Sequence, residues 1–66
     1  MYRIRKDVSI MKINKTVVSE IIGISRVYLT NILNGKQNCS KVIAYCITKF
    51  INPELEIDDI FNREEN

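Results

Sequence analysis

The chain has 66 residues, of which 45% are hydrophobic and 27% charged, and its formal net charge is +2 at pH 7. A chain of this length buries only about 60% of the surface that its unfolded form exposes, so we expect one small domain of modest stability over residues 1–66. No apolar run approaches the ~20 residues that cross a bilayer, and the start MYRIRKDVS lacks the apolar stretch of a signal peptide. These features argue against a membrane protein and predict a cytoplasmic one.

The charge is unevenly distributed along the chain. Residues 1–49 contain nine Lys and Arg against two acidic residues, whereas residues 50–66 contain one Arg against six acidic residues. A basic body with an acidic end is typical of a protein that binds a polyanion on one face and keeps it away from another. The alternative is that these charges are solvated and bind no such partner.

The sequence offers little material for catalysis or metal binding. Histidine is absent, so Cys39 and Cys46 are the only soft metal ligands, and two thiols do not complete a zinc site. Seven residues of helix would separate their Cα atoms by ~10 Å, which exceeds the ~7 Å that a disulfide spans. We expect Cys46 to be a small core residue and Cys39 a loop thiol without a role. The chain is predicted to be no enzyme and to need no cofactor and no metal.

Few residues interrupt helices, since the only proline is Pro53 and the only glycines are Gly23 and Gly35. A first helix is predicted to end near Lys12, because apolar residues recur at helical spacing at Ile4, Val8 and Met11. A second helix is predicted between the N-cap Asn14 and Gly23, with a buried side formed by Val18, Ile21 and Ile22.

Three more helices follow by the same criteria. A third is predicted between the N-cap Ser25 and Gly35, burying Leu29, Ile32 and Leu33. Ser40 caps a fourth, which ends at Asn52 because the residue before proline is biased away from the α region; its apolar side contains Ile43, Cys46, Ile47, Phe50 and Ile51. A short fifth helix from about Ile57 to Arg63 turns its apolar residues to the core or to a second subunit. β-branched stretches such as TVVSEIIGI make strand a local competitor, but the pattern favours an all-α domain of five helices.

The segment Gly23-Ile24-Ser25 joins two of these helices within very few residues. Glycine adopts a left-handed conformation without steric cost, Ile24 fills the angle between the helices, and Ser25 caps the next helix at once. Ser19, four residues before the glycine, is small enough to let the helices approach closely. This pattern predicts a helix-turn-helix.

The stretch INKTVVSEIIGISRVYLTNILNG resembles the helix-turn-helix core of the phage-repressor and Cro-like (Xre-type) family of bacterial DNA-binding proteins. The positions that match the family pattern are Lys15, Ser19, Gly23, Ile24, Ser25, Leu29, Ile32, Asn34 and Gly35. The segments KQNCSKVIAYCITKF and INPELEIDDIF resemble the family's fourth and fifth helices, so the resemblance extends over residues 13–61. It implies a compact, lambda-repressor-like fold whose third helix enters the major groove of DNA.

The resemblance also implies which side chains contact DNA. Arg26 is expected to donate to O6 and N7 of guanine, and Asn31 to pair with N6 and N7 of adenine. Val27 would touch a thymine methyl group, and Tyr28 would reach a base or a phosphate, although all four also suit an exposed or packed helix surface. Phosphate contacts are expected from Lys15, Ser25, Asn34, Lys36 and Lys41. The basic start RIRK is either an arm that reaches a groove or, as we prefer, part of the first helix.

These expectations together describe a sequence-specific, double-stranded-DNA-binding transcriptional regulator, a small repressor of a phage or mobile element that occupies an operator as a homodimer. The dimer seam is expected on an apolar stripe of an otherwise acidic helix, formed by Ile57, Ile60 and Phe61. Closure of the monomer core by the same side chains is the alternative. A protein-interaction module on the same fold, such as an antitoxin or anti-regulator, is the alternative function, and the basic residues around the motif favour DNA.

Overall fold

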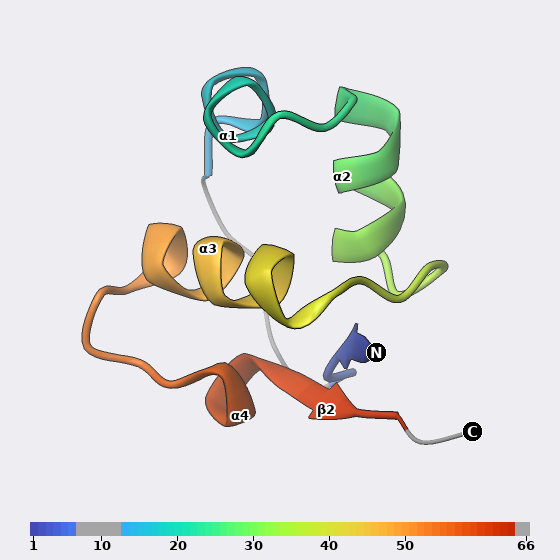
Figure 1. Cartoon of the computed structure of the whole chain (residues 1–66), viewed down its shortest axis with the longest axis vertical. Helices are drawn as coiled ribbons and strands as arrows, with labels where there is room; N and C mark the ends of the chain where they lie inside the picture. Colours follow the sequence, from blue (N-terminus) through green and yellow to red (C-terminus); the bar gives the residue numbers. More distant parts are fainter. Residues whose placement is uncertain (7–12, 65–66) are drawn as a thin grey trace.

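The computed structural model describes residues 1–6 and 13–64, which form four helices and one two-stranded antiparallel sheet (Figure 1). The helices are α1 (Lys15–Ile22), α2 (Arg26–Leu33), α3 (Lys41–Ile51) and α4 (Ile57–Ile60), and the strands are β1 (Tyr2–Ile4) and β2 (Phe61–Arg63). The architecture is therefore mixed α/β, and the prediction of an all-α domain of five helices is wrong.

The predicted beginnings and ends of the three longer helices are confirmed. The side chains of Asn14, Ser25 and Ser40 each accept a hydrogen bond from the backbone N–H three residues further on, at 3.1, 3.0 and 3.3 Å. These bonds satisfy N–H groups that have no partner inside the helix. Gly23 and Gly35 have φ angles of +87° and +76°, in the left-handed region that glycine adopts most easily.

The core lies where α1, α2 and α3 meet the sheet. Leu29, Ile32, Ile47 and Phe61 are at most 1% exposed and come from α2, α3 and β2. The apolar side of α1 is narrower than predicted, because Val18 is buried whereas Ile21 is 65% exposed. The other buried apolar residues of the described part of the chain are Ile4, Leu33, Cys39, Ala44 and Ile60.

β1 joins the two ends of the chain to one another. It pairs with β2 in antiparallel register, with Tyr2 opposite Arg63 and Ile4 opposite Phe61. On its other side, the backbone of Tyr2 exchanges two hydrogen bonds with that of Cys39, each 2.7 Å long. β1 therefore lies between β2 and the segment that leads into α3, and this pairing fixes both ends of the described chain on the same side of the molecule (Figure 1).

The two strands replace parts of the predicted first and fifth helices. Residues 2–4 are extended, with Ile4 in the core, and the rest of the predicted first helix, including Val8 and Met11, lies outside the described residues. The fifth helix ends at Ile60, because Phe61 leaves the helical path and pairs with β1. Successive side chains of a helix diverge by about 100°, and the change to strand lets both Ile60 and Phe61 enter the core.

Two properties of the described residues bear on membranes and metals. No single helix is long and apolar enough to cross a membrane; α1 and α2 meet such a test only as a pair, which is bent by 109°. Within residues 1–6 and 13–64, no group of three or more His, Cys, Asp or Glu side chains could hold a metal ion.

Candidate nucleic-acid interface

The α1–turn–α2 unit has the steep crossing that its sequence predicts. Its two helices lie at 109° to each other, within the range of about 90–120° found in helix-turn-helix units. The N–H groups of Gly23 and Ile24 both donate to the carbonyl oxygen of Ser19, at 2.8 and 3.0 Å. Ser19 is buried and Ile24 is half-buried against the core, so the residues at the turn are packed where α1 and α2 meet.

The first turn of α2 presents two exposed side chains. Arg26 and Val27 both face solvent, and Val27 is 71% exposed. Nη1 of Arg26 donates to Oγ1 of Thr16 at 3.1 Å, a bond that links the start of α2 to the start of α1. A guanidinium has five N–H donors, so this bond orients Arg26 and leaves donors for another partner. Sequence reasoning missed Thr16, because the contact spans ten residues and depends on the crossing angle.

Tyr28 and Asn31 are less available than the first turn of the helix. Both are half-buried, and the ring of Tyr28 packs against the core. Much of the Tyr28 side chain is therefore packed against the protein, as the alternative predicted, and only the rest of it faces outward. Asn31 lies one helical turn beyond Val27, on the same side of α2.

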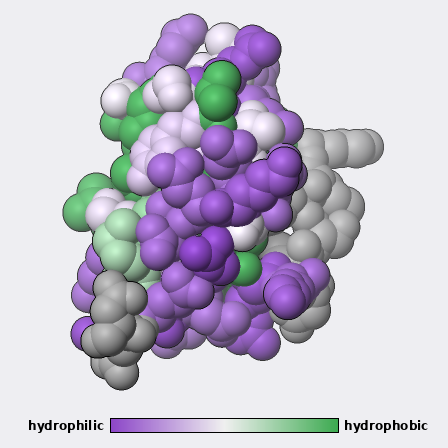
Figure 2. Space-filling model, turned by 90° about the vertical axis from the view of Figure 1, so that its right-hand side faces the viewer, coloured by the Kyte–Doolittle hydropathy of each residue, from purple (hydrophilic) through white to green (hydrophobic). Residues whose placement is uncertain are grey.

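The far end of α2 is a tightly bonded turn. The N–H of Gly35 donates to the carbonyl of Ile32 at 3.1 Å, and the N–H of Lys36 donates to that of Asn31 at 2.9 Å. These are the paired bonds of a Schellman motif. The turn leaves the side chains of Asn34 and Lys36 exposed. The side of the molecule where α2 lies is covered mainly by hydrophilic side chains (Figure 2).

The residues expected to contact phosphates do not form one group. Lys15 and Ser25 lie at the starts of α1 and α2, and the hydroxyl oxygen of Ser25 already accepts the N–H of Tyr28. At the other end of α2 follow Asn34 and Lys36. Lys41, at the start of α3, is exposed but lines a shallow hollow together with the acidic residues Glu56 and Asp58. Its positive charge is therefore partly offset by neighbours that the sequence pattern did not place beside it.

Most of the side chains predicted to form the dimer seam are buried inside the monomer. Ile60 and Phe61 are 5% and 1% exposed, and Ile57 is half-buried against the core. A seam built on Ile60 and Phe61 would have to withdraw them from the core. The burial of Ile60 and Phe61 agrees with the alternative, in which these side chains close the monomer core.

The two cysteines have exchanged the environments expected of them. Both are free thiols, but Cys39 is fully buried in the core and Cys46 is only half-buried. Burial raises the pKa of the Cys39 thiol to about 11. The prediction that Cys39 is a loop thiol is wrong, because the backbone of Cys39 pairs with Tyr2 at the edge of β1 and its side chain is buried in the core.

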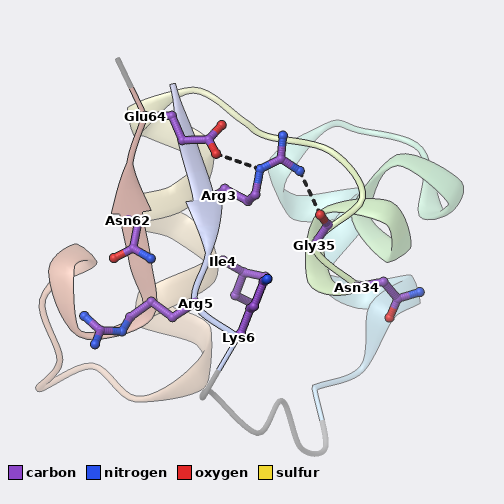
Figure 3. Close-up of a pocket in the computed structure, with 8 residues that line it drawn as sticks. All are labelled: Arg3, Ile4, Arg5, Lys6, Asn34, Gly35, Asn62 and Glu64. Carbon is purple, nitrogen blue, oxygen red and sulfur yellow. Dashed lines mark hydrogen bonds and ion pairs between the residues drawn. The ribbon is translucent and has the colours of Figure 1, made fainter. Parts of the chain in front are cut away.

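An ion pair near the end of α2 was not predicted. Nε of Arg3 donates to Glu64 at 2.9 Å, and Nη1 of Arg3 donates to the carbonyl oxygen of Gly35 at 2.7 Å (Figure 3). Asn38 donates to the other oxygen of the Glu64 carboxylate at 3.2 Å. The hydrogen bonds from Arg3 and Asn38 lower the pKa of Glu64. These partners are 26 to 61 residues apart in sequence, so no local pattern signals the contact.

Comparison with known proteins assigns no family: no family model matches the chain, and no curated protein or solved structure is significantly similar to it. Its function is therefore inferred from the geometry of α1, α2 and their surroundings.

Proposed function

We propose that the chain is a sequence-specific DNA-binding transcriptional regulator, a small repressor of a phage or mobile element that occupies an operator in the cytoplasm as a homodimer. The observation that carries the proposal is the α1–turn–α2 unit, which crosses at 109° and exposes Arg26 and Val27 at the start of α2. The resemblance of INKTVVSEIIGISRVYLTNILNG to the phage-repressor and Cro-like family supports the same conclusion.

α2 has the dimensions of a helix that enters the major groove. An α-helix with its side chains is about 10–12 Å across, which fits the major groove, about 12 Å wide, and the eight residues of α2 extend over ~12 Å along the helix axis. In this arrangement the first turn of α2 meets the base edges. Arg26, oriented by Thr16, donates to guanine, and the exposed Val27 packs on a thymine methyl group. Asn31 reaches a base one helical turn further along.

Affinity comes mainly from phosphates on either side of the groove. Lys15 lies at the start of α1, and Asn34 and Lys36 follow the end of α2, so cationic and amide groups flank the reading helix at both ends. Lys41 contributes less, because Glu56 and Asp58 share its hollow. Binding is therefore expected to weaken steeply as the salt concentration rises.

The decisive experiment selects bound sequences from a random pool of duplex DNA and then compares variants on the selected site. Arg26→Ala should lose ~1–3 kcal/mol on that site and relax the preference at one base pair of each half-site, because the bidentate contact to guanine is gone. Binding to random DNA should change little. Arg63→Ala removes the same charge from the exposed edge of β2 and serves as the matched control. Failure of the pool to enrich any sequence overturns the proposal.

One observation favours a protein-interaction module, such as an antitoxin or anti-regulator, as a second candidate. α3 exposes Val42, Tyr45 and Phe50 at 71%, 52% and 39%, and a hollow of about 220 Å³ lies beside Tyr45, Cys46 and Phe50. Adjacent exposed apolar side chains are typical of protein-binding surfaces. The same selection separates the two candidates, since a module that binds only protein enriches no DNA sequence.

A further inference from the structure

An exposed, mostly apolar surface runs along α3, outside the helix that is proposed to read bases. α3 lies between α1 and α4, and its inward side is buried in the core (Figure 1). On its outward side Val42, Tyr45 and Phe50 are exposed, and a hollow of about 220 Å³ lies among Tyr45, Cys46, Lys49 and Phe50. Residues three and four apart share one side of a helix, so these five residues form one surface, the α3 face.

The single charged side chain of the α3 face is already paired. The ammonium group of Lys49 donates to the carbonyl oxygens of Pro53 and Leu55, at 3.1 and 2.7 Å, and lies 3.6 Å from the carboxylate of Glu56. Its charge is therefore held beside the chain that follows α3, while its methylene groups add to the apolar surface. Adjacent exposed apolar side chains of this kind are typical of a contact with another protein.

We propose that the α3 face is the dimer seam, in which α3 packs antiparallel against α3 of a second copy about a two-fold axis at Cys46. Val42 and Phe50 lie four residues before and four residues after Cys46. In a two-fold interface each contact occurs twice, so this axis places the small Val42 against the partner's large Phe50, and the reverse. The inference rests on the homodimer of the proposed function and leaves the buried Ile60 and Phe61 in the core of each chain.

The charges at the two ends of the α3 face also favour a second copy in this orientation. Lys41 directly precedes the face and Glu54 follows it, and both side chains are exposed. Neither of them forms an ion pair with another described residue. The antiparallel arrangement brings Lys41 of each chain toward Glu54 of the other, whereas a parallel one would bring two lysines together. The face is therefore complementary to itself in shape and in charge.

The small size of the α3 face predicts a weak dimer in the absence of DNA. The face extends over ~12 Å of one helix at 1.5 Å per residue, whereas a stable interface buries about 800 Å² on each partner. We therefore expect free chains at low micromolar concentration and dimers at much higher concentration. An operator that holds two copies side by side would raise their effective concentration and complete the seam.

The first test measures self-association of the protein alone. Sedimentation of the wild type up to millimolar concentration should show an equilibrium between monomer and dimer. Val42→Glu should weaken the dimer at least tenfold, because the seam would bury a carboxylate, whereas an acidic side chain in the first turn of α3 suits the folded helix. Ile21→Glu is the matched control, since Ile21 is 65% exposed on α1, and it should leave the dissociation constant unchanged.

Two results of this measurement would overturn the proposal. A wild-type chain that stays monomeric at millimolar concentration leaves the α3 face to a different protein. A dimer that Val42→Glu does not weaken, although circular dichroism shows the variant to be folded, has its seam elsewhere.

The second test locates the two-fold axis. Packed helices have axes 8–10 Å apart and carry their Cα atoms at a radius of about 2.3 Å, so facing Cα atoms approach to about 5 Å, a distance that a disulfide spans. Mild oxidation should therefore link two chains through Cys46, since Cys39 is fully buried. Cys46→Ser should give no linked dimer, and Val42→Glu should form it at least tenfold more slowly.

A protein that dimerises but forms no link through Cys46 would overturn the proposed axis. Neither test contains DNA, so the two proposals fail separately. If random duplex DNA yields no enriched sequence, the proposed function is wrong, while sedimentation and cross-linking still decide whether the α3 face is a seam.

Discussion

The thiol of Cys39 shows how far burial changes the chemistry of one side chain. Its pKa is raised to about 11 because desolvation penalises the thiolate. At pH 8 such a thiol is ionised to roughly one part in a thousand, and the thiolate is the reactive form. We expect Ellman's reagent to modify one thiol, Cys46, in the native protein and the second only on unfolding. Native Cys46→Ser should show no rapidly reacting thiol; equal rates for both thiols in wild type would contradict the burial of Cys39.

Glu64 is expected to make the stability of the fold depend on pH. Its pKa lies below the ordinary value of 4.5 because Arg3 and Asn38 donate to the carboxylate. A carboxyl group whose folded pKa is lowered stabilises the protein above its unfolded pKa, and this contribution disappears as the pH falls through the folded pKa. Wild type should therefore lose more stability than Glu64→Gln between pH 5 and pH 3, measured by thermal unfolding. Parallel curves for the two proteins would show that the carboxylate bonds do not contribute.

At the scale of elements, the boundaries of the three longer helices were predictable from the sequence and strand pairing was not. Asn14, Ser25 and Ser40 cap their helices through bonds to residues three positions away, so the signal is local. The pairing of Ile4 with Phe61 joins positions 57 residues apart through strands of three residues, too short to show alternation. The apolar spacing of the first residues also suited a helix, and only tertiary pairing decides between the two.

The same distinction applies to the candidate site. The exposure of Arg26 and Val27 follows from the position of the cap Ser25 and was predicted. The bond from Arg26 to Thr16 depends on how the two helices meet in space, so it has no sequence pattern of its own. Only the first half of the RIRK segment, Arg3 and Ile4, lies in a strand, and Arg3 is bonded to Gly35 at the end of α2; this corrects the preference for a helix there.

Substitutions of Gly35 measure how much the turn that ends α2 contributes to stability. Its φ of +76° is costly for any residue with a Cβ, whereas the nearest side-chain atom would lie at an ordinary contact distance of 3.8 Å. The penalty of Gly35→Ala is therefore conformational, and we expect a loss of ~1–2 kcal/mol in the free energy of unfolding by urea. Gly35→Asn should lose less, because asparagine tolerates this region better. Equal stabilities of wild type and Gly35→Ala would mean that the turn relaxes to another conformation.

At the scale of the whole molecule, stability depends on one aromatic side chain near the C-terminus. Phe61 is 1% exposed and is the largest fully buried side chain of the described core. Phe→Ala substitutions in cores cost about 3–5 kcal/mol, and a chain of this size has a total of only ~3–10 kcal/mol. Phe61→Ala should lose its helical circular dichroism at 37 °C. If the variant stays folded and only its association changes, Phe61 belongs to a dimer interface and not to the monomer core.

The proposed dimer follows from the dimensions of the chain. A single reading helix contacts too few base pairs to select one site among the ~10⁶ or more that a genome offers. The molecule is 29 Å long in its longest dimension, whereas successive major grooves on one side of DNA lie about 34 Å apart. One chain carries one α2, so under the proposed function a second copy is expected to supply the second half-site.

Two copies related by a two-fold axis should therefore bind a near-palindromic operator with half-site centres about 34 Å apart. The seam must leave Ile60 and Phe61 in place, since both are needed in the core of each chain. Sedimentation of the wild-type protein with operator DNA should give two chains per duplex, and footprinting should show two protected half-sites. An operator cut to one half-site should bind far more weakly, because the second copy then loses its contacts. If one chain binds per duplex and protects a single asymmetric site with full affinity, the homodimer is wrong, while DNA recognition by α2 still stands.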